Sequence, residues 1–369
     1  MIERIHIKNF RMLKDVTVDL PRFAVLVGKN STGKTTLIKA IEFVADIASL
    51  GVDNAIERAL DGSFASYNDL CFDSSNPIEF TIDYRNGEHP ARYHLGIGGS
   101  EDVGIVHERL ERGPLPPLRL DVPIGKVLKA PILLQATPEN PMFLGDPVMK
   151  ATNFGITRLN AIFGSIRVIE LKSRSLRLPS PARSPKVLSS DGASLASAAR
   201  ALRERDLPAF RQWVDHVAGA VEGLEEIDIW DRPEDRASVL RAKFQGREDW
   251  VPSNFLSDGT LRLLALSLLA YAEKPDDAGI VLVEEPENGL HPLAMQYVFD
   301  ALAGMEHTQV FVATHSPIFL AQATLDDALY FSRNPDGSAS IVRGSDLAKA
   351  KGWDDAVRLE TLFAAGVLS

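Results

Sequence analysis

The spacing of apolar residues divides the chain into predicted strands and helices. Alternating positions and short continuous apolar runs are typical of strands, and they occur at residues 2–7, 16–20, 23–27, 280–283 and 309–313. Apolar residues three or four positions apart are typical of amphipathic helices, and they occur at residues 37–47, 193–205, 208–221, 257–269 and 292–305, with a surface helix expected from residue 354. The succession of strand, helix and strand in the last third predicts parallel pairing within an α/β sheet.

The middle of the chain follows a different pattern. From Pro77 to about Ala136, alternating apolar residues predict antiparallel β structure, with a hairpin turn at Asn86 and Gly87. Residues 137–192 are poorly patterned, with prolines and serines that are typical of an exposed loop. We therefore predict three parts: a first lobe at 1–136, an inserted helical lobe with a basic loop at 137–254, and a second lobe at 255–369.

A glycine-rich segment follows the predicted strand at 23–27 and precedes the first predicted helix. It fits G-x-x-x-x-G-K-[ST], the phosphate-binding P-loop, and we expect nucleotide contacts from Gly28, Lys29, Asn30, Ser31, Thr32, Gly33, Lys34, Thr35 and Thr36. The glycines let the backbone approach a polyphosphate closely, and the loop N–H groups converge on phosphate oxygens at the helix start. Lys34 would reach the β and γ phosphates of ATP, and the Thr35 hydroxyl would hold Mg²⁺.

Two adjacent carboxylates end the predicted strand at 280–283. An apolar strand that ends in acids is the expected second half of a P-loop site. Glu284 would hold Mg²⁺ through water, and Glu285 would polarise the water that attacks the γ-phosphate. The sequence therefore predicts an ATP and Mg²⁺ site that combines residues 28–36 with this acidic pair.

Composition narrows the class of protein. The 369 residues suffice for one large or two modest domains, and 45% hydrophobic with 24% charged residues is typical of a soluble globular protein. Cys71 is the only cysteine, which excludes an internal disulfide framework and a cysteine-rich metal site. The first seven residues resemble a strand and not a signal peptide, and no apolar run approaches the ~20 residues of a membrane span. We therefore expect a cytoplasmic protein without a membrane partner.

The net charge of −10 argues against a surface coated with nucleic acid. One stretch departs from that balance, because Arg167, Lys172, Arg174, Arg177, Arg183 and Lys186 accompany only Glu170, and Arg200, Arg203 and Arg205 follow on a predicted helix. Two interpretations of residues 167–205 stay open. One is a phosphate-facing patch that binds DNA, and the other is a solvated loop beside an amphipathic helix.

Four segments together resemble the ABC-type ATPases of the RecF, SMC and OLD group. They are GKNSTGKT at 28–35, LSDGT at 256–260, VLVEEPENGLHP at 281–292 and VATHSP at 312–317. The likeness is greatest to small bacterial members that lack long coiled coils, and the two ends of the chain carry it. The resemblance implies an α/β P-loop fold with a mixed central sheet flanked by helices, an N-terminal antiparallel β subdomain and a helical lobe.

The same resemblance implies a role for each motif. Such proteins form a head-to-tail homodimer with two ATP molecules sandwiched between the subunits. Ser257 and Gly259 match the signature motif, which contacts the γ-phosphate bound by the partner. Glu285 matches the catalytic glutamate and His315 the histidine that senses the γ-phosphate. Arg11 matches a basic residue that touches the nucleotide in part of the group.

The sequence departs from the wider family pattern in three places. Glu284 stands where an aspartate usually holds the metal, and it is one methylene longer. The signature motif reads Ser-Asp-Gly-Thr at 257–260 in place of Ser-Gly-Gly-Gln. The glutamine of the Q-loop is not assigned, although Gln135 follows an apolar run. Residues 288–291 do match the loop that lies at the dimer seam.

Four functions follow from these motifs in order of preference. The first is an ATP-driven dimerisation switch that controls a separate nuclease or toxin in defence against phage, since the chain ends soon after the histidine motif, without room for a fused nuclease domain. The second is a RecF-like DNA-binding repair ATPase that uses the basic stretch 167–205. The third is the ATP subunit of a transporter, and the fourth is a nucleotide-dependent scaffold that does not hydrolyse ATP.

Overall fold

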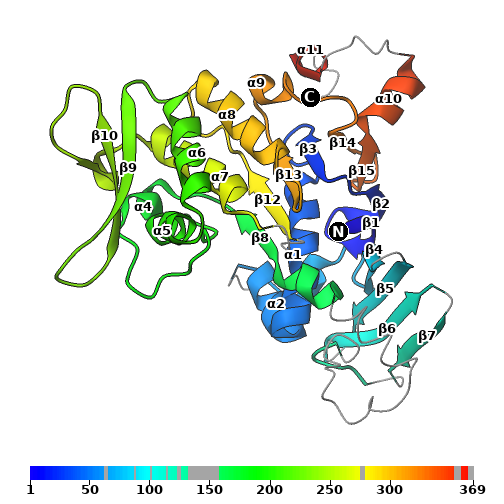
Figure 1. Ribbon diagram of the computed structural model, residues 1–369. Helices are drawn as coiled ribbons and strands as arrows, with labels where there is room; N and C mark the ends of the chain where they lie inside the picture. The colour runs from blue at the N-terminus through cyan, green and yellow to red at the C-terminus, as the bar shows by residue number, and fades with distance from the viewer. Residues whose placement is uncertain are drawn as a thin grey trace.

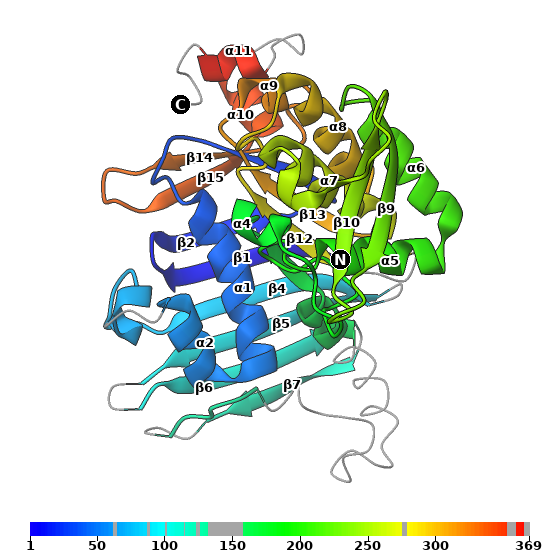
Figure 2. The same cartoon turned by 90° about the vertical axis from the view of Figure 1, so that its left-hand side faces the viewer.

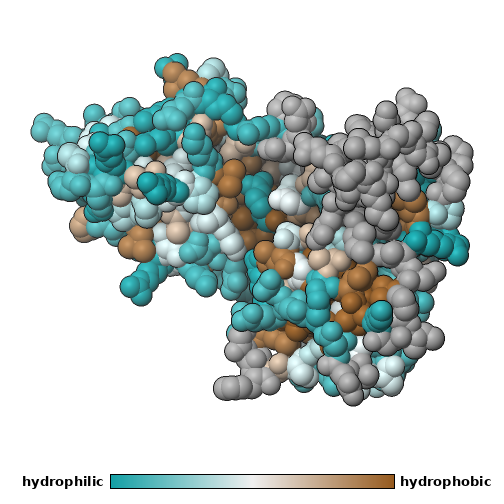
Figure 3. Space-filling view, turned by 90° about the horizontal axis from the view of Figure 1, so that it is seen from below, coloured by the Kyte–Doolittle hydropathy of each residue, from teal (hydrophilic) through white to brown (hydrophobic). Residues whose placement is uncertain are grey.

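The computed structural model of the chain describes residues 1–61, 65–86, 89–99, 102–113, 115–122, 126–131, 158–274, 279–352 and 359–364. Within these residues, two six-stranded sheets and one three-stranded sheet form the β structure. Helices pack between and beside the sheets (Figure 1). Seen from below, the part with β9 and β10 is largely hydrophilic, whereas hydrophobic residues gather in the recess beside it (Figure 3).

The central sheet has the strand order β15-β14-β3-β13-β12-β8. Its strands are β3 (Phe23–Val27), β8 (Ile166–Ile169), β12 (Ile280–Glu284), β13 (Gln309–Ala313), β14 (Ala328–Arg333) and β15 (Ala339–Arg343). All neighbours pair in parallel except β14 and β15, which form an antiparallel hairpin. The strands β3, β12 and β13 are short apolar runs because both faces of a parallel sheet are covered by other elements.

A second sheet, antiparallel throughout, has the order β2-β1-β4-β5-β6-β7. Its strands are β1 (Ile2–Phe10), β2 (Leu13–Asp19), β4 (Ile78–Asn86), β5 (His89–Gly98), β6 (Gly104–Arg112) and β7 (Leu115–Asp121), and the short helix η1 (Tyr67–Leu70) precedes β4. The predicted hairpin is confirmed, since Asn86 pairs with His89 at the end of the β4–β5 ladder. The predicted N-terminal antiparallel subdomain is therefore present.

Helix α1 (Lys34–Leu50) lies between these two sheets and is followed by α2 (Val52–Ala59) (Figure 2). Its apolar residues are buried on almost every side, because one core cluster joins it to both the central and the antiparallel sheet. Phe43 of α1, for example, stacks on Phe10 of β1 with ring centroids 5.4 Å apart. The P-loop at the start of α1 is thus fixed by a helix that cannot shift without disturbing the core.

The other face of the central sheet is covered by helices: α4 (Ser173–Arg177), α5 (Leu195–Arg205), α6 (Leu207–Ala218), α7 (Asp258–Ala272), α8 (Pro292–Ala303) and α9 (Pro317–Leu320). A small antiparallel sheet of β9 (Leu224–Asp231), β10 (Ser238–Phe244) and β11 (Val251–Pro252) lies at the outer end of this layer, followed by η3 (Ser253–Phe255) (Figure 1). The sequence predicted the helices α5 and α6 here but not this sheet. Asp206 caps α6, accepting a hydrogen bond from the backbone N–H of Ala209 at 3.0 Å.

The predicted fold class is confirmed, and the three-part division of the chain stays a prediction. One feature bears on that division. β8 lies within the predicted insert of 137–254, yet it pairs with β12 in the central sheet.

The helices α10 (Gly344–Lys351) and α11 (Leu359–Ala364) end the described chain. Among the described residues, no helix combines the length and the apolar character that crossing a membrane requires.

Candidate nucleotide-binding and hydrolysis site

Three loops that follow neighbouring strands of the central sheet meet at one edge. β3, β13 and β12 are adjacent and parallel, so their carboxyl ends lie together. The P-loop follows β3, the loop with the paired acids follows β12, and the loop with His315 follows β13. They enclose a cavity of about 250 Å³ whose described lining consists of Met12, Asn30, Ser31, Gly33, Lys34, Thr35, Thr36, Glu284, Glu285, Ala313 and His315.

The P-loop backbone takes a conformation that needs glycine at two positions. Gly28 has φ +155° and Gly33 has φ +111°, and a Cβ atom on Gly28 would overlap the carbonyl oxygen of Phe331. Ser31 between them also has a positive φ, 61°. The Thr32 hydroxyl closes the turn by donating to the carbonyl oxygen of Lys29 at 2.8 Å. The loop is thereby held in a tight turn at the start of α1, where backbone N–H groups favour an anion.

Lys34 lies inside this turn. Its Nζ donates to the carbonyl oxygens of Gly28 at 2.7 Å and of Lys29 at 2.9 Å, and the residue is 7% exposed. Burial lowers the pKa of Lys34, while nearby glutamates, Glu285 foremost, oppose that shift. A buried cation that donates to neutral carbonyls at the edge of a cavity suits a polyphosphate, which would supply further opposite charge.

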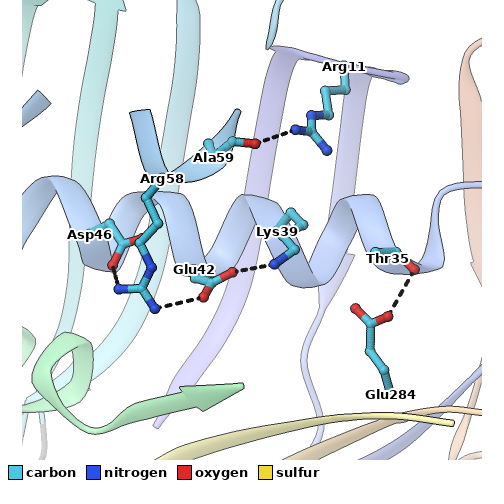
Figure 4. Close-up of polar contacts among 8 residues, drawn as sticks. All are labelled: Arg11, Thr35, Lys39, Glu42, Asp46, Arg58, Ala59 and Glu284. Carbon is cyan, nitrogen blue, oxygen red and sulfur yellow. Dashed lines mark hydrogen bonds and ion pairs between the residues drawn. The ribbon is translucent and has the colours of Figure 1, made fainter. Parts of the chain in front are cut away.

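Thr35 and Glu284 are the two predicted metal ligands, and they face each other. The Thr35 hydroxyl lies 3.4 Å from Oε2 of Glu284, as the close-up of α1 and the end of β12 shows (Figure 4). Burial raises the pKa of the Glu284 carboxyl, whereas the Lys39 ammonium lowers it. A hydroxyl and a carboxylate are oxygen ligands of the kind Mg²⁺ prefers. The pair therefore fits the metal, and the longer glutamate still reaches the threonine.

Glu285 is held in an uncommon backbone conformation at the cavity. Its φ is 45°, and its backbone N–H donates to the carbonyl oxygen of Ala313 on β13 at 2.8 Å. The side-chain amide of Asn288 donates to Oε2 of Glu285 at 2.8 Å. A left-handed conformation in a residue other than glycine costs free energy and is often found at functional sites. Here it turns the second acid of the pair toward the cavity.

His315 lines the same cavity from the loop after β13, and Glu287 holds that loop. The backbone N–H of His315 donates to Oε1 of Glu287 at 2.6 Å, while Oε2 of Glu287 is buried and has no hydrogen-bond partner among the described residues. Burial lowers the pKa of His315, and the Lys34 ammonium lowers it further. The sequence did not single out Glu287. The available signal was a third acid two positions after Glu285, in the same loop.

The signature residues begin α7 and do not line this cavity. Ser257 caps the helix, since its hydroxyl accepts from the backbone N–H of Thr260 at 3.0 Å. A Cβ atom on Gly259 would lie 2.7 Å from the carbonyl oxygen of Gly289, so the helix start is packed closely on the loop after β12. The sequence predicted that these residues contact a nucleotide held by a second copy, and that role stays a prediction.

Arg11 points away from the cavity in this structure. Its guanidinium donates to the carbonyl oxygen of Ala59 at the end of α2, with Nη2 at 2.7 Å, and burial lowers its pKa (Figure 4). The nucleotide contact predicted for Arg11 remains untested. Gln135, the unassigned glutamine, lies outside the described residues.

Four arginines of the basic stretch 167–205 are engaged with protein groups. Arg177 pairs with Asp258, Arg200 with Asp231 and Arg203 with Asp228, the last at 2.7 Å. Arg205 donates to the carbonyl oxygens of Ala272 and Tyr271 at the end of α7. These arginines stabilise the packing of α4 and α5 against their neighbours. The part of the stretch that can face DNA is smaller than the sequence suggests.

Two protein-family models match separate parts of the chain. Residues 164–321 match the family described as "AAA domain, putative AbiEii toxin, Type IV TA system", and residues 1–88 match the family described as "AAA ATPase domain". The two matches contain the P-loop, the signature residues, the acidic pair and His315. The chain is also similar to an OLD nuclease of Thermus scotoductus, at 25% identity over 401 residues that cover 100% of this chain and 71% of that protein.

Solved structures with a similar fold include SMC head domains. One is an SMC head bound to the C-terminal winged-helix domain of ScpA, with a TM-score of 0.60 and 16% identity over 92% of this chain and 96% of that one. Another is an SMC head domain with an extended coiled coil, bound to the C-terminal domain of ScpA from Pyrococcus furiosus. Its TM-score is 0.57, at 16% identity over 95% of this chain and 98% of that one. At identities this low, the structural likeness shows a shared fold and nothing further.

Proposed function

We propose that this chain, which belongs to the ABC-type ATPases of the RecF, SMC and OLD group, is an ATP-driven dimerisation switch. The observation that carries the proposal is the split between its motifs. Lys34, Glu284, Glu285 and His315 line one cavity, whereas Ser257 and the rest of the signature motif are absent from its described lining. A second copy that brings its signature helix to the cavity would complete the site, and ATP would then join the two copies.

Each cavity residue has a role in that scheme. The ammonium of Lys34 and the N–H groups of the P-loop would bind the phosphates and offset their charge. Asn288 holds the Glu285 carboxylate, which would accept a proton from the attacking water. Mg²⁺ held by Thr35 and Glu284 would supply further positive charge beside the phosphates. His315, whose pKa is lowered, would be neutral near pH 7 and able to donate one hydrogen bond to the γ-phosphate.

The switch would act on an effector. Three of the similar proteins have names that indicate a function: an OLD nuclease, a family described as a putative toxin, and SMC heads bound to a domain of ScpA. These names support an ATPase that controls another protein activity. We propose that ATP closure and hydrolysis reshape the helical layer of α4 to α8, and that a separate nuclease or toxin in anti-phage defence responds to this change.

The RecF-like alternative needs DNA to reach the basic stretch 167–205. It is less supported, because Arg177, Arg200, Arg203 and Arg205 are held by internal contacts. Lys172, Arg174 and Arg183 remain as residues through which DNA could be bound.

Steady-state ATP hydrolysis with and without linear duplex DNA, at near-physiological salt, tests both candidates. The switch predicts slow hydrolysis that DNA does not change, and the Glu285→Gln variant provides the blank. Clear stimulation by DNA, lost on reversing Lys172, Arg174 and Arg183 to glutamate, would favour the RecF-like alternative. No hydrolysis above the blank would contradict the ATPase itself.

A further inference from the structure

Phe255 projects into solvent two residues before the signature serine. It ends the short helix η3, and 75% of the residue is exposed, a larger fraction than for any other exposed large hydrophobic side chain among the described residues. Ser253 and Leu256 nearby are buried, at 3% and 4% exposed, whereas Asn254 directly before it is exposed. A single exposed apolar residue is ordinary on a protein surface. The backbone on both sides of Phe255, however, is fixed by an unusual set of hydrogen bonds.

Arg177 of α4 forms hydrogen bonds to the segment that carries Phe255. Its Nη1 donates to the carbonyl oxygen of Asn254 at 2.9 Å and to that of Leu256 at 2.8 Å, the two residues that flank Phe255. Its Nη2 donates to the carboxylate of Asp258 in the signature motif. In return the Ser253 hydroxyl donates to the carbonyl oxygen of Arg177 at 3.3 Å. One guanidinium thus holds the carbonyls on either side of the ring and the first residue of α7.

These contacts use the geometry of arginine. A planar guanidinium presents donors in a fixed fork, so three acceptors constrain both the position and the orientation of the segment. The hydrogen bond from Arg177 also lowers the pKa of Asp258, which keeps that carboxylate ionised and paired. With the carbonyls of Asn254 and Leu256 turned inward to Arg177, the side chain between them is directed outward.

The surroundings of Phe255 indicate what covers it. Leu178, 53% exposed, directly follows Arg177, and Leu293, 44% exposed, lies in the first turn of α8. The loop before α8 is the one that packs closely on Gly259. Exposed apolar residues thus lie next to α4 and in α8, two elements that contact the signature helix α7. The proposed dimer would bring the start of that helix to a second nucleotide-binding cavity. Aromatic residues and arginines are over-represented among the anchors of protein interfaces.

We propose that Arg177 is a positioning residue that presents Phe255 to a second copy of this chain, where the ring becomes buried when ATP closes the dimer. The inference rests on the proposed dimerisation switch and adds an anchor to it. Ser257 and Gly259 must approach the nucleotide of the second copy, and Phe255, two residues away on the same rigid segment, must then meet the surface beside that nucleotide. Arg177 acts at a distance from the nucleotide, through the backbone of residues 254–258.

Sedimentation velocity of the Glu285→Gln protein with ATP and Mg²⁺ is the test, with Phe255→Ala, Arg177→Lys and Trp230→Ala each added. Trp230 is the matched control, because it is an aromatic residue 41% exposed on β9. Phe255→Ala is expected to raise the dissociation constant of the ATP-bound dimer at least about tenfold. Arg177→Lys should raise this dissociation constant similarly, since lysine keeps the positive charge but lacks the planar set of donors of the guanidinium. Trp230→Ala should leave the constant unchanged.

Binding of a fluorescent ATP analogue to dilute monomer is measured in parallel, and neither Phe255→Ala nor Arg177→Lys should alter it. If the Glu285→Gln protein stays monomeric with ATP bound, the proposed dimerisation switch is wrong, and the proposed role of Phe255 is overturned as well. If it dimerises and Phe255→Ala dimerises equally tightly, the switch stands and the anchor is wrong. If Arg177→Lys also weakens ATP binding by the monomer, Arg177 supports the fold in general and the positioning role is overturned.

Discussion

The hydroxyl of Thr35 lies 3.4 Å from Oε2 of Glu284, across the edge where α1 begins and β12 ends. These residues are 249 positions apart in the chain, and the parallel pairing of β3, β13 and β12 brings them together. The distance is long for a direct hydrogen bond between oxygens. Both groups are oxygen donors of the kind that Mg²⁺ prefers, and we propose them as the metal ligands of the ATPase.

Replacing Lys34 by alanine should sharply weaken ATP binding. The ammonium is the buried cation of the P-loop, and losing one or two charge-assisted hydrogen bonds corresponds to roughly tenfold to 100-fold in affinity. Titration with a fluorescent ATP analogue measures the change. Lys14→Ala is the control, because Lys14 pairs with Asp336 on the surface. Equal affinity of the Lys34→Ala protein and wild type would remove the P-loop assignment.

The pKa of Glu284 predicts a pH-dependent effect on stability. Burial raises this pKa in the folded protein, so the metal-free fold favours the protonated acid. The resulting stability is present below the ordinary pKa of glutamate and is lost as pH rises through the raised one. Glu284→Gln, which stays neutral, should therefore melt at a higher temperature than wild type at pH 7, with a smaller difference near pH 4.

Mg²⁺ provides the second half of that experiment. Millimolar Mg²⁺ should raise the melting temperature of wild type at pH 7 in the presence of a non-hydrolysable ATP analogue, and should have less effect on Glu284→Gln. Melting curves with and without the metal measure both effects. Equal stabilisation of the two proteins by Mg²⁺ would show that Glu284 does not hold the metal.

Asn288→Ala should lower the turnover number without changing the Michaelis constant for ATP. The Asn288 amide orients the Glu285 carboxylate at 2.8 Å and lies outside the described lining of the cavity. A misplaced base costs rate in the chemical step, here by about tenfold, whereas loss of the base itself costs about 10²- to 10⁴-fold. Steady-state kinetics separate the two constants. An unchanged turnover number would mean that Glu285 needs no such support.

Gly259→Ala should destabilise the fold by about 1–3 kcal/mol, the range for forcing an atom into a packed site. The new methyl group would meet the carbonyl oxygen of Gly289 at 2.7 Å and push the start of α7 from its neighbouring loop. Gly164→Ala is the control, since a Cβ atom there meets nothing within 4 Å. Urea unfolding compares the two proteins, and equal stability would contradict the close approach.

Local sequence was sufficient to select the P-loop, the acidic pair and His315 as candidate site residues, and residues from all three line one cavity. Each of these lies directly after a short apolar run, and in an α/β fold the ends of such strands form the site. Contacts between distant segments were not predictable in the same way. Arg177 belongs to a run of basic residues in the sequence, yet its carboxylate partner is Asp258, 81 positions further along.

The small sheet of β9 to β11 shows a second limit. Its strands alternate only weakly, with burial confined to a few positions such as Leu224, Ile227 and Ile229. Charged residues on the other face of β9 pair with the helical layer instead, as Asp228 does with Arg203. The alternation in β9 is confined to Ile227, Asp228 and Ile229, which is shorter than the run of about four to eight residues that identifies a strand, so a helical lobe was expected there.

The dimerisation switch is tested most directly by the mass of the Glu285→Gln protein in solution, measured by sedimentation velocity with and without ATP and Mg²⁺. Without its base the variant should bind ATP and not hydrolyse it, so the closed state would accumulate. We predict a monomer of 40.4 kDa without nucleotide and a species of twice that mass when ATP is saturating. An unchanged monomer, with ATP binding verified in the same sample, would contradict the switch.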